Sequence, residues 1–248
     1  MDSRVYGEFD LSNKEAIRQK KPTRGPRRGT VHTIYEALAD RYGHPQATHP
    51  SGKPIDVLVE TILSQHTSDK NSHRAYLQLR RTFPRWADLL TADPREIERA
   101  IQSGGLAKQK SVRIQRVLRI IAEREGRISL ACLRRLSDQD AYNYLTSLPG
   151  IGDKTACCVL LFALGRAVMP VDTHIHRIIK RLGWIAPSAS PEAARQVLER
   201  TLPADILYHM HVLLIAHGRQ TCQAQRPRCR ECPIRLRCPS RRLAVIGK

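Results

Sequence analysis

Apolar residues recur at intervals of three and four positions along most of the chain, with polar residues between them. This spacing places the apolar side chains on one face of a helix, so each stripe predicts an amphipathic α-helix. No segment shows a convincing strand-like alternation, so the predicted fold class is all-α. The clearest stripes are Val31, Ile34, Tyr35, Leu38 and Tyr42; Ile55, Leu58, Val59, Ile62 and Leu63; Ile114, Val117, Leu118 and Ile121; Ile175, Ile178, Ile179 and Leu182; and Ile206, Met210, Leu213 and His217.

Residues that start and stop helices punctuate these stripes. Gly165 and Gly183 stand where helices are expected to end. Ser137 with Asp140 has the pattern of a capping box, which predicts a helix beginning there. Short loops therefore join the predicted helices.

The charge of the chain narrows the choice of partner. Its 248 residues include 42 Lys and Arg against 23 Asp and Glu, a net charge of +19. Such a charge favours an anionic partner, with nucleic acid first and an acidic membrane surface second. A merely basic protein without such a partner is the alternative.

Two further features bear on location. No apolar run approaches the roughly 20 residues that a membrane span needs, and the N-terminus has no signal-peptide core. We therefore expect a cytoplasmic protein without a membrane partner.

Residues 1–29 are predicted to be a disordered basic tail, with six basic and no acidic residues between Arg18 and Arg28. The tail is either solvated or a non-specific arm on phosphates.

The string SLPGIGDKTA, at residues 147–156, places two glycines and a proline between two predicted helices. Proline restricts the residue before it, and glycine permits backbone conformations closed to other residues. The string predicts a tight hairpin whose uncovered N–H groups, at a helix N-terminus, bind an anion such as a DNA phosphate. An ordinary αα-hairpin is the alternative for the LPG part alone. The full string favours a helix-hairpin-helix element.

Lys154 and Asp172 are the candidate reactive pair. Lys154 falls in the first turn of a helix predicted over 153–164, where the helix dipole disfavours a cation and so favours a neutral, nucleophilic amine. Asp172, in VDTHIHR, precedes the next helix and is a favoured N-cap. The first helix is about 16 Å long, and residues 165–172 can stretch to roughly 26 Å. The chain can therefore return Asp172 to Lys154, which predicts a buried reactive cleft.

Four of the seven cysteines lie close together near the C-terminus. In a reducing compartment such a group predicts a metal site rather than disulfides. Zinc and an iron–sulfur cluster both accept four thiolates, so the residues alone leave both open. Cys157 and Cys158 are expected to be core residues. The four clustered residues are Cys222, Cys229, Cys232 and Cys238.

The strings LPGIGDKTA and VDTHIHR together make the chain resemble the helix-hairpin-helix, Gly/Pro-Asp superfamily of DNA glycosylases. Within it, the chain is most similar to endonuclease III, over residues 30–240. The resemblance implies that Lys154 attacks C1′ of a damaged nucleotide and that Asp172 supports the attack. The resulting Schiff base lets the strand be cut by β-elimination. The lysine places the chain with the bifunctional branch, because the related mismatch adenine glycosylases lack it.

The resemblance also implies a cofactor and a set of DNA contacts. The cysteine spacing C-x6-C-x2-C-x5-C matches the family's [4Fe–4S] loop. SQHTSD, at 64–69, resembles the wedge that fills the gap left by an extruded nucleotide. His66 stands where the family usually has glutamine, which leaves the lesion and opposite-base preferences open. Leu106 aligns with a second wedge, with a buried leucine as the alternative. The predicted DNA contacts are Gln65, His66, Leu106, Gly150, Ile151, Gly152, His174 and Arg219.

The resemblance predicts two helical domains that flank a DNA-binding cleft. Residues 47–166 would form a six-helix domain, and residues 30–46 with 167–240 a cluster-bearing domain, before a basic tail at 241–248. The expected function is a monomeric, nucleoid-associated bifunctional DNA glycosylase/AP lyase. It would remove oxidised pyrimidines of the thymine glycol type from double-stranded damaged DNA. The alternatives are a non-catalytic DNA-binding module, and a glycosylase for a mismatched base or a pyrimidine dimer.

Overall fold

A computed structural model describes residues 25–46 and 53–242 of the chain. This part contains helices and no strand, which confirms the predicted all-α class there. Most of the two predicted tails lies outside the described residues, although the first helix already begins at Arg28. The α-helices are α1 (Arg28–Tyr42), α2 (Pro54–Ser64), α3 (Asp69–Thr82), α4 (Asp88–Thr91), α5 (Pro94–Ala100), α6 (Ala107–Glu125), α7 (Asp138–Thr146), α8 (Asp153–Cys158), α9 (Thr173–Arg181), α10 (Pro191–Thr201) and α11 (Leu207–Gln220).

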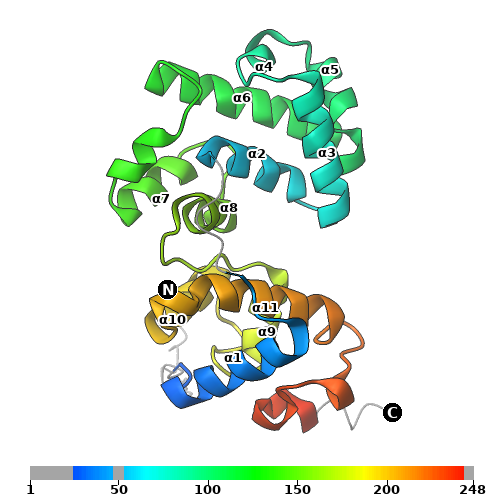
Figure 1. Cartoon of the computed structure of the whole chain (residues 1–248), viewed down its shortest axis with the longest axis vertical. Coiled ribbons are helices and arrows are strands. Elements are labelled where there is room, and N and C mark those ends of the chain that lie inside the picture. Colours follow the sequence, from blue (N-terminus) through cyan, green and yellow to red (C-terminus); the bar gives the residue numbers. More distant parts are fainter. Residues whose placement is uncertain (1–24, 47–52, 243–248) are drawn as a thin grey trace, which may run out of the picture.

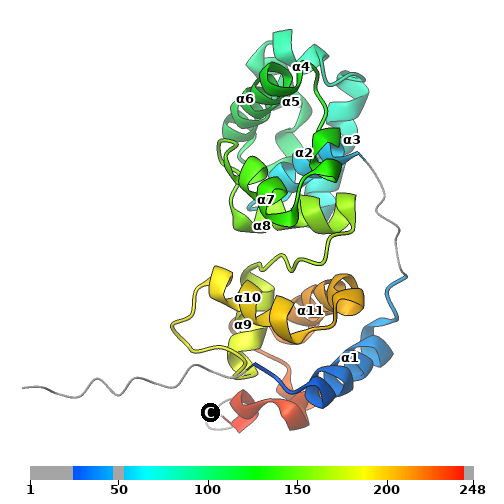
Figure 2. The ribbon, with the colours of Figure 1, turned by 90° about the vertical axis from the view of Figure 1, so that its left-hand side faces the viewer.

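The helices form two lobes, each around its own apolar core (Figure 1). The hairpin lobe contains α2 to α8, and its core runs from Ile55 to Val168. The cysteine lobe contains α1, α9, α10, α11 and the turns that carry the four clustered cysteines. Its core combines apolar residues of α1 with residues from Met169 onward. A view turned by 90° also shows the two lobes stacked along the long axis (Figure 2). The N-terminal helix α1 thus packs with the C-terminal part of the chain.

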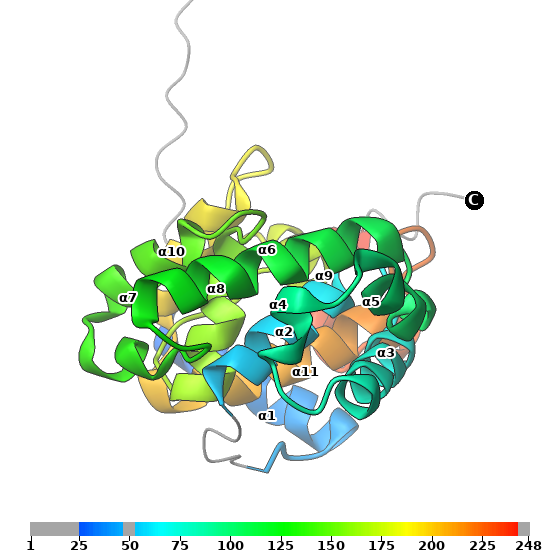
Figure 3. The same cartoon turned by 90° about the horizontal axis from the view of Figure 1, so that it is seen from above.

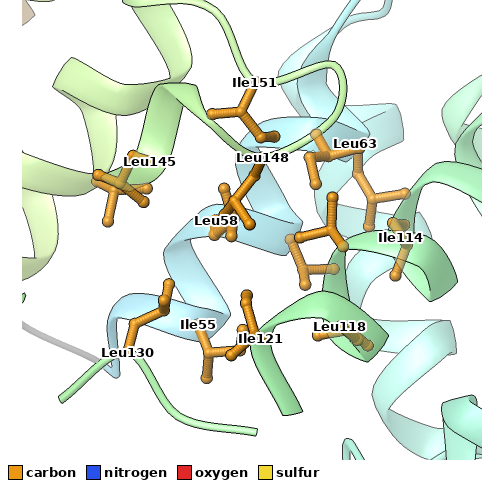
Figure 4. Packing of buried hydrophobic residues seen from close by; sticks show 14 of the residues in the cluster. Ile55, Leu58, Leu63, Ile114, Leu118, Ile121, Leu130, Leu145, Leu148 and Ile151 are labelled. Carbon is orange, nitrogen blue, oxygen red and sulfur yellow. The ribbon is translucent and has the colours of Figure 1, made fainter. Parts of the chain in front are cut away.

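Helix α2 is the central element of the hairpin lobe. Most of its side chains are buried, and it packs against α3, α6 and α8. The long helix α6 runs across the same lobe (Figure 3). Leu148 of the hairpin lies beside Leu58 of α2, and Ile151 lies next to Leu148 (Figure 4). These apolar contacts hold the hairpin against the core and orient the helix that follows it.

The helix predicted over residues 153–164 has a different course. It is α8 followed by a π-helix, Val159–Ala163. The segment is apolar on nearly every side, so its hydrophobic pattern does not show where the helix widens. The predicted ends are confirmed, because Gly165 and Gly183 adopt positive φ angles of 67° and 69°. The predicted cap is confirmed too, since Asp140 donates its backbone N–H to Ser137 Oγ (3.1 Å).

Candidate active site

The hairpin between α7 and α8 depends on its glycines. Gly150 has a φ of +74°, and a Cβ there would lie 2.5 Å from Nε of Arg113. Gly152 is the N-cap of α8, and no side chain caps the helix. Ile151 is buried between the two exposed glycines, so it anchors the turn rather than facing solvent. The backbone N–H groups at the start of α8 therefore lack a side-chain acceptor.

Lys154 and Asp172 come from different lobes and line the same cleft. Lys154 lies in the first turn of α8. Asp172 is the N-cap of α9, and its Oδ1 accepts a hydrogen bond from the backbone N–H of Ile175 (2.8 Å). The cleft has a volume of about 530 Å³, within the range of pockets that hold a small ligand. The structure thus places in one cleft the two residues that the sequence analysis paired.

Two buried groups lie close to this pair. Cys158, one turn after Lys154, is buried, and burial raises the pKa of its thiol, while Lys154 acts to lower it. His211 of α11 is buried too, and burial lowers its pKa to about 4. The Nδ1 of His211 donates a hydrogen bond to the Pro170 carbonyl (3.1 Å). The amine and the carboxylate therefore lie next to a poorly hydrated protein interior.

The side chains of the two predicted wedge segments differ in their exposure to solvent. Gln65 is half-buried and its amide is engaged within the protein. It donates to Thr155 Oγ1 (3.2 Å) and accepts from Nη1 of Arg113 (2.7 Å). The next residue, His66, is exposed. Leu106 is 49% exposed, so the alternative of a buried leucine is wrong.

Arg219 and His174 line the cleft from the cysteine lobe. Arg219 of α11 forms a two-pronged ion pair with Asp69 of α3, which links the lobes at the cleft. His174 of α9 packs directly on Gly218, where a Cβ would lie 2.8 Å from that of His174. Arg177 donates to Nδ1 of His174 (3.0 Å) and to the Gly218 carbonyl (3.0 Å). His174 is therefore held by contacts within the protein.

The four clustered cysteines line one small cavity in the cysteine lobe, together with Ile178, Ile234 and His217. Arg181 donates a hydrogen bond to Sγ of Cys222 (3.2 Å). Across the described residues, no three His, Cys, Asp or Glu side chains converge closely enough to hold a single metal ion. The four thiols nevertheless share one cavity, which could hold a thiolate-bound cofactor. Cys157 and Cys158 are buried in the hairpin lobe, which confirms that they are core residues.

Several contacts at the site were not predicted from the sequence. Arg113 supports both Gln65 and the hairpin, and Lys110 is buried although it is a lysine. Lys110 precedes Ile114 by four positions and so extends the apolar stripe of its helix. That placement is the signal that could have identified it.

Comparisons with known proteins agree with this architecture. Residues 59–204 match the model of the HhH-GPD superfamily base excision DNA repair proteins. A putative DNA glycosylase from Arabidopsis thaliana is 40% identical over 66% of this chain, and the match spans only 56% of that protein. Endonuclease III from Thermotoga maritima is 34% identical over 77% of this chain and 84% of its own length.

A solved structure agrees with the sequence relatives. A trapped covalent intermediate of endonuclease III with DNA superposes with a TM-score of 0.77 and 25% identity, over 89% of this chain and 99% of that one. No helix in the described residues is both long and apolar enough to cross a membrane. The chain belongs to the endonuclease III family, within the HhH-GPD superfamily of base excision DNA repair proteins, and is a DNA glycosylase.

Proposed function

We propose that the chain is a bifunctional DNA glycosylase/AP lyase that removes oxidised pyrimidines from duplex DNA. The observation that carries this proposal is the shared cleft, to which one lobe contributes Lys154 and the other Asp172. The exposed His66 lines the same cleft. An extruded nucleotide can therefore meet a nucleophile, a carboxylate and a wedge in one place. The two lobes act as the two domains of a monomer on nucleoid DNA.

The proposed chemistry assigns one role to each residue of the pair. The Lys154 amine, once it has given up its proton, forms a bond to C1′ of the extruded nucleotide as the bond from C1′ to the base breaks, and the base leaves with a proton. Asp172 stabilises the positive charge that develops on the sugar and helps to deprotonate the amine. Opening of the sugar ring leaves a Schiff base, which acidifies the hydrogen on C2′. Loss of that proton to a base or water breaks the bond from C3′ to the 3′ phosphate oxygen by β-elimination, and water then hydrolyses the Schiff base to free Lys154. Only Oδ1 of Asp172 holds the helix cap, which leaves the second oxygen for this work.

The hairpin and the arginines supply affinity rather than base recognition. The exposed glycines at 150 and 152 let a phosphate approach the first turn of α8. The arginines beside the cysteines add positive charge on the cysteine lobe, whereas the charge of Arg219 is paired with that of Asp69 at the cleft. Gln65 supports the hairpin from within, through Thr155 and Arg113, and His66 is the side chain offered to the DNA. Lesion choice then depends on the pocket and on His66.

We further propose that the four clustered cysteines hold a [4Fe–4S] cluster. The donors fit, because all four thiols line one cavity. Among the described residues that line it, His217 is the only His, Asp or Glu side chain. Four thiolates can hold either zinc or an iron–sulfur cluster. The spacing C-x6-C-x2-C-x5-C, which resembles the family's cluster loop, supports the cluster. A bound cluster would cross-link α11 to the turns after it and so stabilise the cysteine lobe.

A panel of duplexes tests the substrate. Each carries one lesion: thymine glycol, a mismatched thymine, or a cyclobutane pyrimidine dimer. The proposal expects base release followed by strand cleavage from thymine glycol at a rate at least tenfold above the other two. Preferred release of the mismatched base or of the dimer would assign a different lesion to the same chemistry. Binding of all duplexes without release would support a DNA-binding module.

A further inference from the structure

Lys110 of α6 is a buried lysine with two carbonyl partners. Its side chain is only 2% exposed. Its Nζ donates to the carbonyl of Leu63 (2.7 Å) and to that of Gly104 (2.8 Å). Burial, and then the charge of Arg113, lower the pKa of this amine. A buried amine is tolerated only where hydrogen bonds satisfy it, so these two bonds are the reason that Lys110 occupies a core position.

The two carbonyls belong to the two segments that carry the wedges. Leu63 lies in the last turn of α2, three residues before His66. Gly104 ends the short 3₁₀ turn two residues before Leu106. These segments are separated by about forty residues of sequence, and Lys110 joins them through one atom. Gly104 also packs closely on α3, since a Cβ there would lie 3.1 Å from Cβ of Ala75.

The backbone is unusual at both wedges. Across the described residues, His66 (φ 54°) and Leu106 (φ 49°) are the only non-glycine residues with positive φ. Left-handed backbone at a residue with a Cβ is unfavourable and persists where the surroundings hold it. The two such residues both follow a carbonyl that Lys110 holds. One buried group thus sits behind both strained and exposed side chains.

We propose that Lys110 is a positioning residue that fixes the spacing of His66 and Leu106 for insertion into DNA. This inference rests on the proposed function, because a wedge matters only if a nucleotide is extruded. Lys110 itself touches neither DNA nor the reacting atoms. It acts by fixing the end of α2 relative to the turn before α6, so that both wedges enter the duplex together.

The first test compares two substrates with the variant Lys110→Met. Duplex thymine glycol requires wedge insertion, whereas an abasic site in a single-stranded oligonucleotide does not. We expect a roughly 10- to 100-fold fall in single-turnover base release from the duplex, as for a small misplacement of a binding group. Cleavage of the single strand should change less than threefold. Lys108→Met removes the same charge from an exposed position on the same helix and should preserve both activities.

The second test is a double-mutant cycle with His66→Ala/Leu106→Ala. If Lys110 acts through the wedges, Lys110→Met should cost little duplex activity in that background. An equal loss in both backgrounds, or equal losses on the duplex and the single strand, would overturn the proposal. If Lys110→Met does not fold, Lys110→Gln, which can still donate to one carbonyl, takes its place. A wild-type protein that cuts neither substrate would contradict the proposed function instead.

Discussion

Arg195 of α10 lies against Asp153 of α8, with 2.9 Å between Nε and Oδ1, and so joins the two lobes at the residue before Lys154. The contact is an electrostatic pairing rather than a well-directed hydrogen bond, because the Nε–H has no aligned acceptor. The Tyr142 hydroxyl also donates to Asp153 Oδ1 (3.1 Å), and Arg195 pairs with Glu199. The lobe that carries Asp172 is thereby fixed to the helix that carries Lys154.

Replacing Arg195 should therefore loosen the site as well as the fold. Arg195 and Asp153 are 19% and 11% exposed, so Arg195→Met leaves a largely buried carboxylate without its cation. We expect a loss of about 3 kcal/mol in the free energy of unfolding. Arg200→Met, at an exposed position of the same helix, should cost less than about 0.5 kcal/mol. Urea denaturation of both variants measures this, and equal stability of the two would contradict the role of the pair.

The two hairpin glycines should differ in their response to a methyl group. Gly150→Ala places a Cβ at positive φ and against Arg113, so the unfolding free energy should fall by about 1–3 kcal/mol. Gly152→Ala meets no atom within 4 Å and needs no unusual φ, so the free protein should keep its stability. Its methyl group lies where a phosphate would approach, and duplex affinity should fall. Thermal unfolding and a DNA titration check both, and unchanged affinity in Gly152→Ala would exclude contact there.

His211 should make stability depend on pH. Its pKa in the folded protein is about 4, below the roughly 6.5 of an unfolded chain. The unfolded state therefore binds a proton on His211 at a higher pH than the folded state does. The stability contributed by burying neutral His211 is complete above about pH 6.5 and is lost as the pH falls towards 4. Its upper limit is about 3 kcal/mol. Burial is the main cause, with Asp172 opposing the shift and Lys154 and Arg219 adding to it.

The variant His211→Asn keeps a donor for the Pro170 carbonyl and removes the titration. We expect its unfolding free energy to fall less steeply between pH 7 and pH 5 than that of the wild type. The variant retains His217, which is also buried, so the difference between the two slopes isolates His211. Parallel slopes would show that His211 does not titrate in this range.

The clustered cysteines should differ from the remaining cysteines in metal content. Cys232→Ser removes one of the four thiols around the cavity, so iron and sulfide should fall well below the wild-type content. Cys132 lies half-buried in the hairpin lobe, and Cys132→Ser should retain both. Elemental and sulfide analysis of protein purified without oxygen gives the result. Zinc in place of iron in the wild type would favour the alternative that the residues alone left open.

The sequence was most informative where a local rule acts alone. The stripes that include Ile34, Leu58 and Ile178 formed helices, because burying one helical face is enough to define them. Asp172 became an N-cap for the same local reason. The burial of Lys110 and the internal bonds of Gln65 depend on residues from other elements, so no local pattern determines them. The positive φ of His66 likewise needs the packed lobe around it.

The measurement that tests the central claim most directly is borohydride trapping on a duplex with one abasic site. Wild type, Lys154→Gln and Asp172→Asn are compared, after circular dichroism has shown equal folding. Asn caps a helix as well as Asp does, so Asp172→Asn removes the charge and keeps the fold. The account predicts a covalent protein–DNA band from the wild type, none from Lys154→Gln, and at least a tenfold slower band from Asp172→Asn. An undiminished band from Lys154→Gln would show that another amine forms the Schiff base and would contradict the account.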